Sequence, residues 1–147
     1  MARPQGGDRH ATVRLVEEED ADGRVAAVYA DIKATKGIDW VPNLWKALAT
    51  NPELLEATWS RLKAVMHPEA LGSLSLLDPM TREVIALAVS VTNGCAYCIN
   101  SHTAAVRKLG LDHEGLAEVM AVIALFNTTN ALAHGYQVEP DVLPPLD

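Results

Sequence analysis

Both cysteines of this 147-residue chain lie in one short segment, Cys95-Ala96-Tyr97-Cys98, and His102 follows four residues after the second. A C-x-x-C pair can close into a disulfide and reopen, or it can supply two thiolates to a metal ion. A histidine one helical turn beyond a cysteine can take up or supply its proton. The residue types and their spacing therefore predict thiol chemistry, which is either redox or metal-binding.

A structural zinc site is the main alternative for the cysteine pair, but a closed zinc site needs four ligands. Cys95, Cys98 and His102 supply only three. The remaining histidines lack ligand spacing: His10, His67, His113 and His134. A c-type haem is excluded because Ile99, not a histidine, follows Cys98. We therefore expect neither a metal nor a cofactor.

Composition favours a soluble protein over one that binds nucleic acid or membranes. The net charge is −7, and no cluster of lysine and arginine occurs on an expected helix. The longest apolar runs, such as residues 120–126, are shorter than the roughly 20 residues that span a bilayer. Residues 1–10 lack the apolar region of a secretory signal. We expect a cytoplasmic protein, where a reducing environment makes a C-x-x-C pair catalytic or metal-binding rather than structural.

The hydrophobic pattern predicts an all-α chain. We expect a disordered N-terminal arm over residues 1–12, a single all-helical domain over residues 13–136, and an extended, proline-rich tail over residues 137–147. Helix starts are indicated by Asn51-Pro52, Asp78-Pro79 and Asp112, and helix ends by Gly37 and Gly110. To within a few residues, helices are expected over residues 17–35, 42–49, 52–67, 79–92, 95–108 and 112–134.

Two of these helices are expected to form the site. Only Asn93-Gly94 separates the fourth helix from the fifth, so the two should fold back as an antiparallel hairpin. Glu83 and His102 lie at similar distances from this turn, roughly 15 Å along each helix. A carboxylate beside an imidazole fixes its tautomer and favours its cation. The geometry therefore allows a chain from Glu83 through His102 to Cys98.

The two cysteines are expected at the start of the fifth helix, where unpaired N–H groups and the helix dipole favour a thiolate. Cys98 and His102 share a helix face, so we expect the imidazole to lower the pKa of the Cys98 thiol further. This layout predicts that Cys98 attacks a peroxide and becomes a sulfenic acid. Cys95 then closes the disulfide.

These residues together resemble a known family. The segment from Arg82-Glu83 to Asn93-Gly94-Cys95-x-Tyr97-Cys98-x-x-x-His102 is similar to the core of the alkylhydroperoxidase D-like branch of the carboxymuconolactone decarboxylase superfamily. Upstream, residues 41–44 and 51–55 resemble the helical lead-in of its peroxidase-related members, so that the resemblance covers roughly residues 20–135. It implies an alkylhydroperoxidase D-like helical bundle with a catalytic helical hairpin, assembled as a homo-oligomer, often a trimer or hexamer.

The resemblance also implies a thiol-dependent hydroperoxide reductase. Cys98 would be the peroxidatic thiol, Cys95 the resolving thiol that meets the reductant, and His102 and Glu83 the proton relay. Tyr97 is a departure, because the best-characterised peroxidases of the group have a second histidine at that position. We expect Tyr97 to be a packing residue whose hydroxyl is at most accessory to the site.

Three functions remain open from the sequence. The first is a hydroperoxide reductase served by a dithiol protein, either a lipoyl domain or a thioredoxin-like protein. The second is a decarboxylase- or isomerase-like acid/base enzyme acting on a small lactone, although that chemistry does not need a C-x-x-C pair. The third is a non-enzymatic protein, either a thiol redox sensor or a metal-binding oligomer. Homo-oligomerisation is also expected, because the last helix is apolar around most of its circumference.

Overall fold

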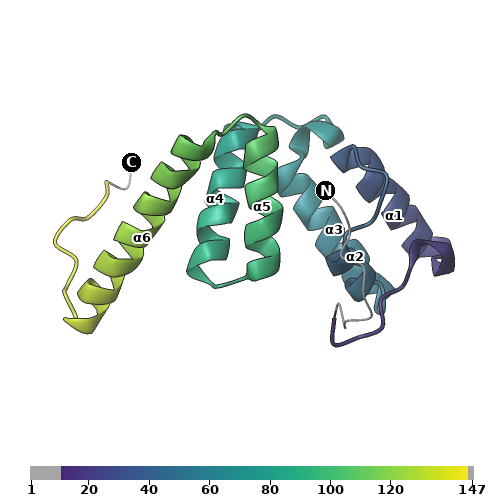
Figure 1. Ribbon diagram of the computed structural model, residues 1–147, viewed down its shortest axis with the longest axis horizontal. Coiled ribbons are helices and arrows are strands. Elements are labelled where there is room, and N and C mark those ends of the chain that lie inside the picture. Colours follow the sequence, from purple (N-terminus) through teal and green to yellow (C-terminus); the bar gives the residue numbers. More distant parts are fainter. Residues whose placement is uncertain (1–10, 146–147) are drawn as a thin grey trace. The chain divides into compact units, whose positions relative to one another are not determined.

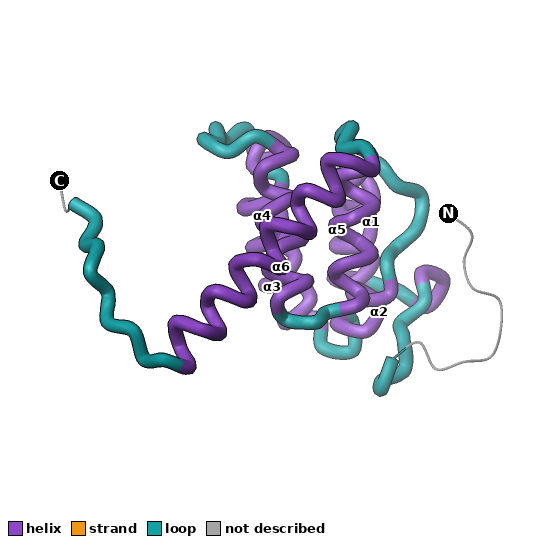
Figure 2. Tube along the Cα trace, turned by 60° about the vertical axis from the view of Figure 1, so that its left-hand side comes forward, coloured by secondary structure: helices purple, strands orange, loops and turns teal. Residues whose placement is uncertain are grey.

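The computed structural model describes residues 11–145 and is all-helical over that range, as predicted (Figure 2). The first ten residues of the expected N-terminal arm lie outside the described residues. Internal contacts divide the chain into two compact units, one up to Ser75 and one from Leu76 onward. The grouping of residues 13–136 into a single domain stays a prediction, and each unit is described by itself.

Within the described residues, the first unit consists of three α-helices and two short 3-10 helices. Figure 1 labels the α-helices as α1, α2 and α3. Its α1 and α3 pack together. Asn51 caps α3, since its side chain accepts a hydrogen bond from the Leu54 N–H, and Pro52 is the first helical residue, as predicted. In chain order the elements are η1 (Glu18–Asp20), α1 (Gly23–Lys36), α2 (Asn43–Leu48), α3 (Pro52–Met66) and η2 (Pro68–Leu71).

The expected start of α1 near residue 17 is wrong. The acidic residues there form the separate turn η1, and α1 begins at Gly23. Glu18 explains the difference, because its carboxylate accepts hydrogen bonds from the Val41 N–H and from Lys33. These long-range contacts hold the segment away from a continuous helix. Gly37 ends α1 in the left-handed conformation, with φ of 61°, as expected of a C-cap glycine.

The core of the first unit is a single apolar cluster, in which Ile32 and Leu55 are fully buried. Trp45 and Trp59 meet edge to face, with ring centroids 5.2 Å apart. The Trp59 indole donates a hydrogen bond of 2.6 Å to Asp31 on α1, which satisfies its one polar atom. The packing of α1 against α3 is therefore fixed by both apolar burial and a directed polar contact.

The second unit contains α4 (Pro79–Thr92), α5 (Ala96–Lys108) and α6 (His113–Gly135). Helices α4 and α5 run antiparallel side by side, as the sequence predicts (Figure 1). The Asp78 carboxylate accepts a 3.0 Å hydrogen bond from the Thr81 N–H at the start of α4. The Asp112 carboxylate accepts a 2.8 Å hydrogen bond from the Gly115 N–H at the start of α6. Both predicted N-caps are therefore confirmed.

The turn between α4 and α5 fixes the cysteines to the end of α4. Gly94 adopts φ of 68°, which suits a residue without a Cβ. The Gly94 N–H bonds to the Val91 carbonyl and the Cys95 N–H to the Ser90 carbonyl, at 3.1 and 3.0 Å, which is the Schellman pattern of helix termination. Cys95 is at once the last residue of this motif and the N-cap of α5, where its sulfur accepts the Cys98 N–H at 3.3 Å.

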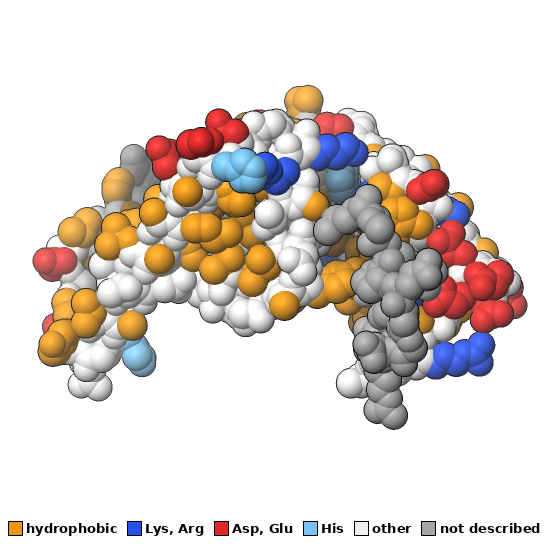
Figure 3. Space-filling model, viewed as in Figure 1, with side chains coloured by type: hydrophobic (Ala, Val, Ile, Leu, Met, Phe, Trp, Pro, Cys, Tyr) orange, Lys and Arg blue, Asp and Glu red, His pale blue; other side chains and the backbone are white. Residues whose placement is uncertain are grey.

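Helix α6 leaves most of its apolar surface uncovered. It has 23 residues, and by length and composition alone it is long and apolar enough to cross a membrane. Only 6% of the apolar 18-residue window that meets this criterion is buried inside the protein. Hydrophobic side chains gather over α4 and α6 in Figure 3. The large exposed ones on these two helices are Ile85, Val89, Val122, Leu125, Phe126 and Leu132. Residues 138–145 form neither helix nor strand.

Candidate functional site

The hairpin of α4 and α5 brings Glu83 and His102 into direct contact. The Glu83 Oε2 atom lies 2.7 Å from His102 Nδ1, and the two side chains are 16% and 24% exposed. An ionised carboxylate can only accept a hydrogen bond, so Nδ1 must be the protonated nitrogen. In the neutral ring this leaves Nε2 without a proton and able to accept one.

The C-x-x-C pair lies at the N-terminus of α5, and both thiols are free and partly exposed. The Cys98 N–H donates a 3.3 Å hydrogen bond to the Cys95 sulfur. The thiol hydrogen bond from Cys98, assisted by the N–H groups of Cys98 and Tyr97, lowers the pKa of Cys95. The same bond, together with burial, raises the pKa of Cys98. The reduced pair therefore carries its first negative charge on Cys95.

This charge distribution differs from the sequence expectation, in which His102 lowers the pKa of Cys98. Among the described residues no hydrogen bond joins the imidazole to either sulfur, and its Nδ1 is turned to Glu83. Four-residue spacing on a helix places two side chains on one face, but it does not decide which neighbour each one bonds. Here His102 bonds the Glu83 carboxylate on α4 rather than the Cys98 thiol.

Ser90 is a member of the site that the sequence reasoning missed. It is 7% exposed and donates a 2.7 Å hydrogen bond from its hydroxyl to the Ala86 carbonyl one turn earlier. The Ser90 carbonyl accepts the Cys95 N–H at 3.0 Å. The Ser90 side chain favours ionisation of Cys98 and so opposes, as a minor cause, the rise in the pKa of that thiol. The available signal was its place seven residues after Glu83, which puts both on one face of α4.

Tyr97 points to a more open environment. Its side chain is 44% exposed, and its backbone N–H contributes to the lowered pKa of Cys95. No group of three or more His, Cys, Asp or Glu side chains within residues 11–145 is arranged to hold a metal ion. The polar groups that the structure brings together are therefore Glu83 with His102, and the two cysteines with Ser90.

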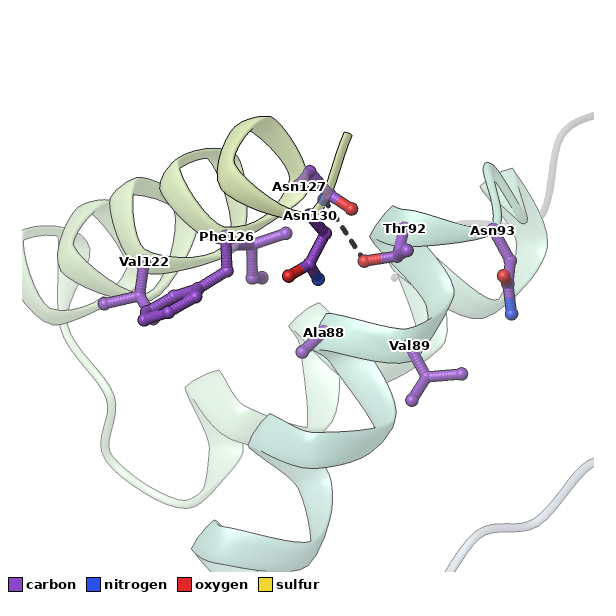
Figure 4. A pocket seen from close by; sticks show the side chains of 9 residues that line it. Ala88, Val89, Thr92, Asn93, Val122, Phe126, Asn127 and Asn130 are labelled. Atoms are coloured by element: carbon purple, nitrogen blue, oxygen red, sulfur yellow. Dashed lines mark hydrogen bonds between the residues drawn. The ribbon is translucent and has the colours of Figure 1, made fainter. Parts of the chain in front are cut away.

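A groove of about 360 Å³ between α4 and α6 lies on another face of α4 (Figure 4). Ala88 and Thr92 line it, and they stand five and nine residues after Glu83, on the opposite side of the helix. One end is polar, where Asn127 donates a 3.2 Å hydrogen bond to Thr92. Val122 and Phe126 make the other end apolar. The groove is thus separate from the thiol site.

Comparison with known proteins places this arrangement in a family. The model of the carboxymuconolactone decarboxylase family matches residues 52–138, which is more than half of the chain. The chain belongs to the carboxymuconolactone decarboxylase family. Within it, the chain is 45% identical to the alkylhydroperoxidase AhpD core from Rhodospirillum rubrum, whose crystal structure it matches with a TM-score of 0.83. The match covers 90% of this chain and 96% of that one, so the alkylhydroperoxidase D-like fold is confirmed.

Proteins similar to this chain carry names of more than one activity. An alkyl hydroperoxide reductase AhpD from Streptomyces griseus is 28% identical over 116 residues, which are 77% of this chain and 62% of that protein. An (R)-2-haloacid dehalogenase from Pseudomonas putida is 33% identical over 112 residues, 76% of this chain and 35% of that protein. The chain thus spans less than two thirds of the length of either relative.

Proposed function

We propose that this protein is a thiol-dependent hydroperoxide reductase that uses Cys98 and Cys95 as its redox pair. The observation that carries the proposal is the contact between Glu83 and His102 on the same hairpin that presents both cysteines. A paired carboxylate and imidazole supply a positioned proton donor and acceptor beside a nucleophile. Similarity to proteins named alkylhydroperoxidase supports the same chemistry.

The proposed cycle has three balanced steps. The Cys98 thiolate attacks the terminal peroxide oxygen, the O–O bond breaks, and an alcohol leaves after taking one proton, so that Cys98 becomes a sulfenic acid. The Cys95 thiolate then attacks the Cys98 sulfur and releases hydroxide, which is protonated to water, as the disulfide forms. Finally a dithiol reduces the disulfide and is itself oxidised to a disulfide.

Glu83 and His102 act in this cycle as a proton relay. Glu83 holds the Nδ1 proton of the ring, so Nε2 accepts a proton in one step and returns it in another. The departing alkoxide and the departing hydroxide both need such a proton. Tyr97, which stands where a second histidine is found in some relatives, is an accessory residue in this scheme.

The reductant is proposed to be a dithiol carried by a protein, either a lipoyl domain or a thioredoxin-like protein, within the cytoplasm. Residues 84–101 contain no Asp, Glu, Lys, Arg or His, so the segment that presents Cys95 adds no charge beyond that of the thiol pair. Such a surface suits the approach of an uncharged dithiol group. The wild-type rate is accordingly expected to depend only weakly on salt.

The test is hydroperoxide consumption by the purified protein with dihydrolipoamide as reductant. Cys98→Ser should abolish turnover, while Cys95→Ser should permit a single turnover that leaves a sulfenic acid, detectable by dimedone labelling and mass spectrometry. Exchange of the exposed Ser101 for alanine is the control on the same helix and should leave turnover intact. A wild-type protein that is inert towards every hydroperoxide and dithiol pair tried would overturn the proposal.

A second candidate is an acid/base enzyme acting on a small lactone, as the family name suggests. The pairing of Glu83 with His102 favours it, because that pair does not depend on the cysteines. Lactone turnover that survives the double change of Cys95 and Cys98 to serine would select this function. A disulfide that forms and reopens without any turnover would instead select a redox sensor.

The protein is further proposed to be a homo-oligomer, a trimer or a hexamer. The uncovered apolar surface of α6 supports this, because soluble monomers seldom expose a large contiguous apolar patch. Light scattering at micromolar concentration measures the mass directly. Phe126→Glu is expected to lower the mass to that of one chain, and a wild-type monomer would contradict the proposal.

A further inference from the structure

A second groove, of about 500 Å³, runs along α3 in the first unit. Its walls are mostly apolar, and Val65, which forms part of them, is 60% exposed. Arg61 is the one charged residue among those that line it. The lining residues are Ala57, Thr58, Arg61, Leu62, Val65 and Met66. All of them belong to α3, so no other described element fills the groove.

Arg61 carries a positive charge that no described residue neutralises. Within residues 11–145, Arg61 and Lys108 are the two cations that form neither a hydrogen bond nor an ion pair. Lys108 stands in the last turn of α5, where the helix dipole favours a positive charge. Arg61 lies outside both end turns of α3, and its neighbours one turn away, Ala57 and Val65, supply no carboxylate. The charge of Arg61 is therefore available to a partner.

The C-terminal tail, residues 138–147, has the complementary character. It contains Glu139 and Asp141 but no lysine, arginine or histidine. Its Val142 and Leu143 side chains are each 82% exposed. Three prolines favour an extended chain, which loses less conformational entropy on binding than a flexible one. The tail thus combines carboxylates and uncovered apolar side chains in one short segment.

The tail also matches this groove in length. Residues 57–66 rise about 14 Å along the axis of α3, and an extended segment from Glu139 to Leu143 spans about 12 Å. A carboxylate paired with Arg61 can therefore bring Val142 and Leu143 onto the apolar part of the groove. The groove between α4 and α6 is lined by neutral residues only, so it offers the acidic tail no opposite charge.

We propose that the groove on α3 binds the C-terminal tail of a second copy of this chain, with Arg61 pairing with Glu139 or Asp141. The chain's own tail does not occupy the groove, since no tail residue lines it. This inference rests on the proposed homo-oligomer and deepens it, because it names a contact between two of the chains. Within an oligomer the second tail is present at high effective concentration, so a contact of modest intrinsic affinity is sufficient.

The experiment is carbodiimide cross-linking of an Arg61→Lys variant. Lysine keeps the positive charge and adds an amine that carbodiimide couples to a nearby carboxylate. A two-chain species should form, and mass spectrometry of its peptides should join position 61 to Glu139 or Asp141. Wild type lacks the amine at position 61 and should lack this peptide. Adding Glu139→Gln and Asp141→Asn to the variant should also remove it, while the native Lys108 should not link to the tail.

A charge exchange supplies a second measurement. Arg61→Glu should raise the dissociation constant of the oligomer, measured by analytical ultracentrifugation, by about threefold or more, because an exposed ion pair is lost and replaced by repulsion. Adding Glu139→Arg and Asp141→Arg should restore the wild-type constant. Lys108→Glu, which reverses the other unpaired charge, is the matched control and should leave the constant unchanged.

The inference is overturned if position 61 links to the tail within single chains only, or does not link to it. A dissociation constant that Arg61→Glu leaves unchanged would also overturn it. An oligomer that keeps its mass without the link would sink this contact but not the proposed assembly. Cross-linking needs no hydroperoxide, so a protein without peroxidase turnover can still show the link. Failure of the proposed function and failure of the inference are therefore distinguishable.

Discussion

The pairing of Glu83 with His102 makes a quantitative prediction about turnover. The hydrogen bond of 2.7 Å joins a carboxylate and an imidazole that are 16% and 24% exposed. A hydrogen bond to a charged partner contributes about 1.5–3 kcal/mol, and partial exposure places this one near the lower end. If the bond acts in the transition state, Glu83→Ala should lower kcat/KM by about 10- to 30-fold. His102→Ala removes the proton acceptor itself and should cost about 100-fold or more.

The decisive variant is the double substitution of Glu83 and His102 by alanine. Because Glu83 acts only through the imidazole, the double variant should be no slower than His102→Ala alone. Initial rates of hydroperoxide consumption with dihydrolipoamide are measured for wild type, the two single variants and the double variant, which together form a double-mutant cycle. Glu118→Ala, on the exposed surface of α6, is the carboxylate control and should match wild type. Losses that multiply in the double variant would refute the reasoning, since they would mean that the two residues act independently.

Three further predictions concern stability and are measured by urea unfolding. Cys95→Ala should lose about 1 kcal/mol because it removes the N-cap of α5, whereas Cys95→Ser should stay within a few tenths of wild type. Leu87→Ala should cost about 2–5 kcal/mol because the side chain is fully buried, while Ile85→Ala, at a 48% exposed position of the same helix, should cost far less. Asp31→Asn should destabilise at neutral pH, because hydrogen bonds from Lys63 and Trp59 lower the pKa of Asp31 in the folded state. A carboxylate whose pKa is lowered by folding stabilises the folded state at pH values above its unfolded-state pKa of about 3.9. The difference in unfolding free energy between Asp31→Asn and wild type should therefore fade as the pH falls through the pKa of Asp31 in the folded state.

Helix boundaries followed from the sequence wherever a local signal governs them. Asn51, Asp78 and Asp112 cap the helices that they were expected to cap, because an N-cap depends on a side chain and a backbone N–H three residues later. The start of α1 was misjudged because the acidic residues before it bond to distant partners. Glu18 contacts Val41, which is 23 positions away and cannot be inferred from local spacing.

The candidate site divides in the same way. The sequence predicts that Glu83 and His102 lie at similar distances from the turn along their helices, because the rise per residue is fixed and the turn is two residues long. The structure brings their side chains into contact. Which sulfur carries the charge did not follow, because it depends on whether the imidazole turns to the carboxylate or to the thiol. The contacts of Ser90 depend on the Schellman turn at Gly94, which rotates Cys95 back onto the end of α4. Spacing alone does not encode that rotation.

The raised pKa of Cys98 is compatible with a peroxide-attacking role. Hydrogen bonding between the two thiols lowers the pKa of Cys95 and raises that of Cys98, so the two titrate as a coupled pair in which Cys95 ionises first. Ionising Cys98 then requires no loss of a proton to solvent, only transfer of its proton to the Cys95 thiolate. The sulfur that results is a stronger nucleophile than one with a low pKa, because intrinsic nucleophilicity falls as the pKa falls. We therefore propose that Cys95 serves as the base for Cys98, so that a tyrosine at position 97 does not prevent the proposed peroxide reduction.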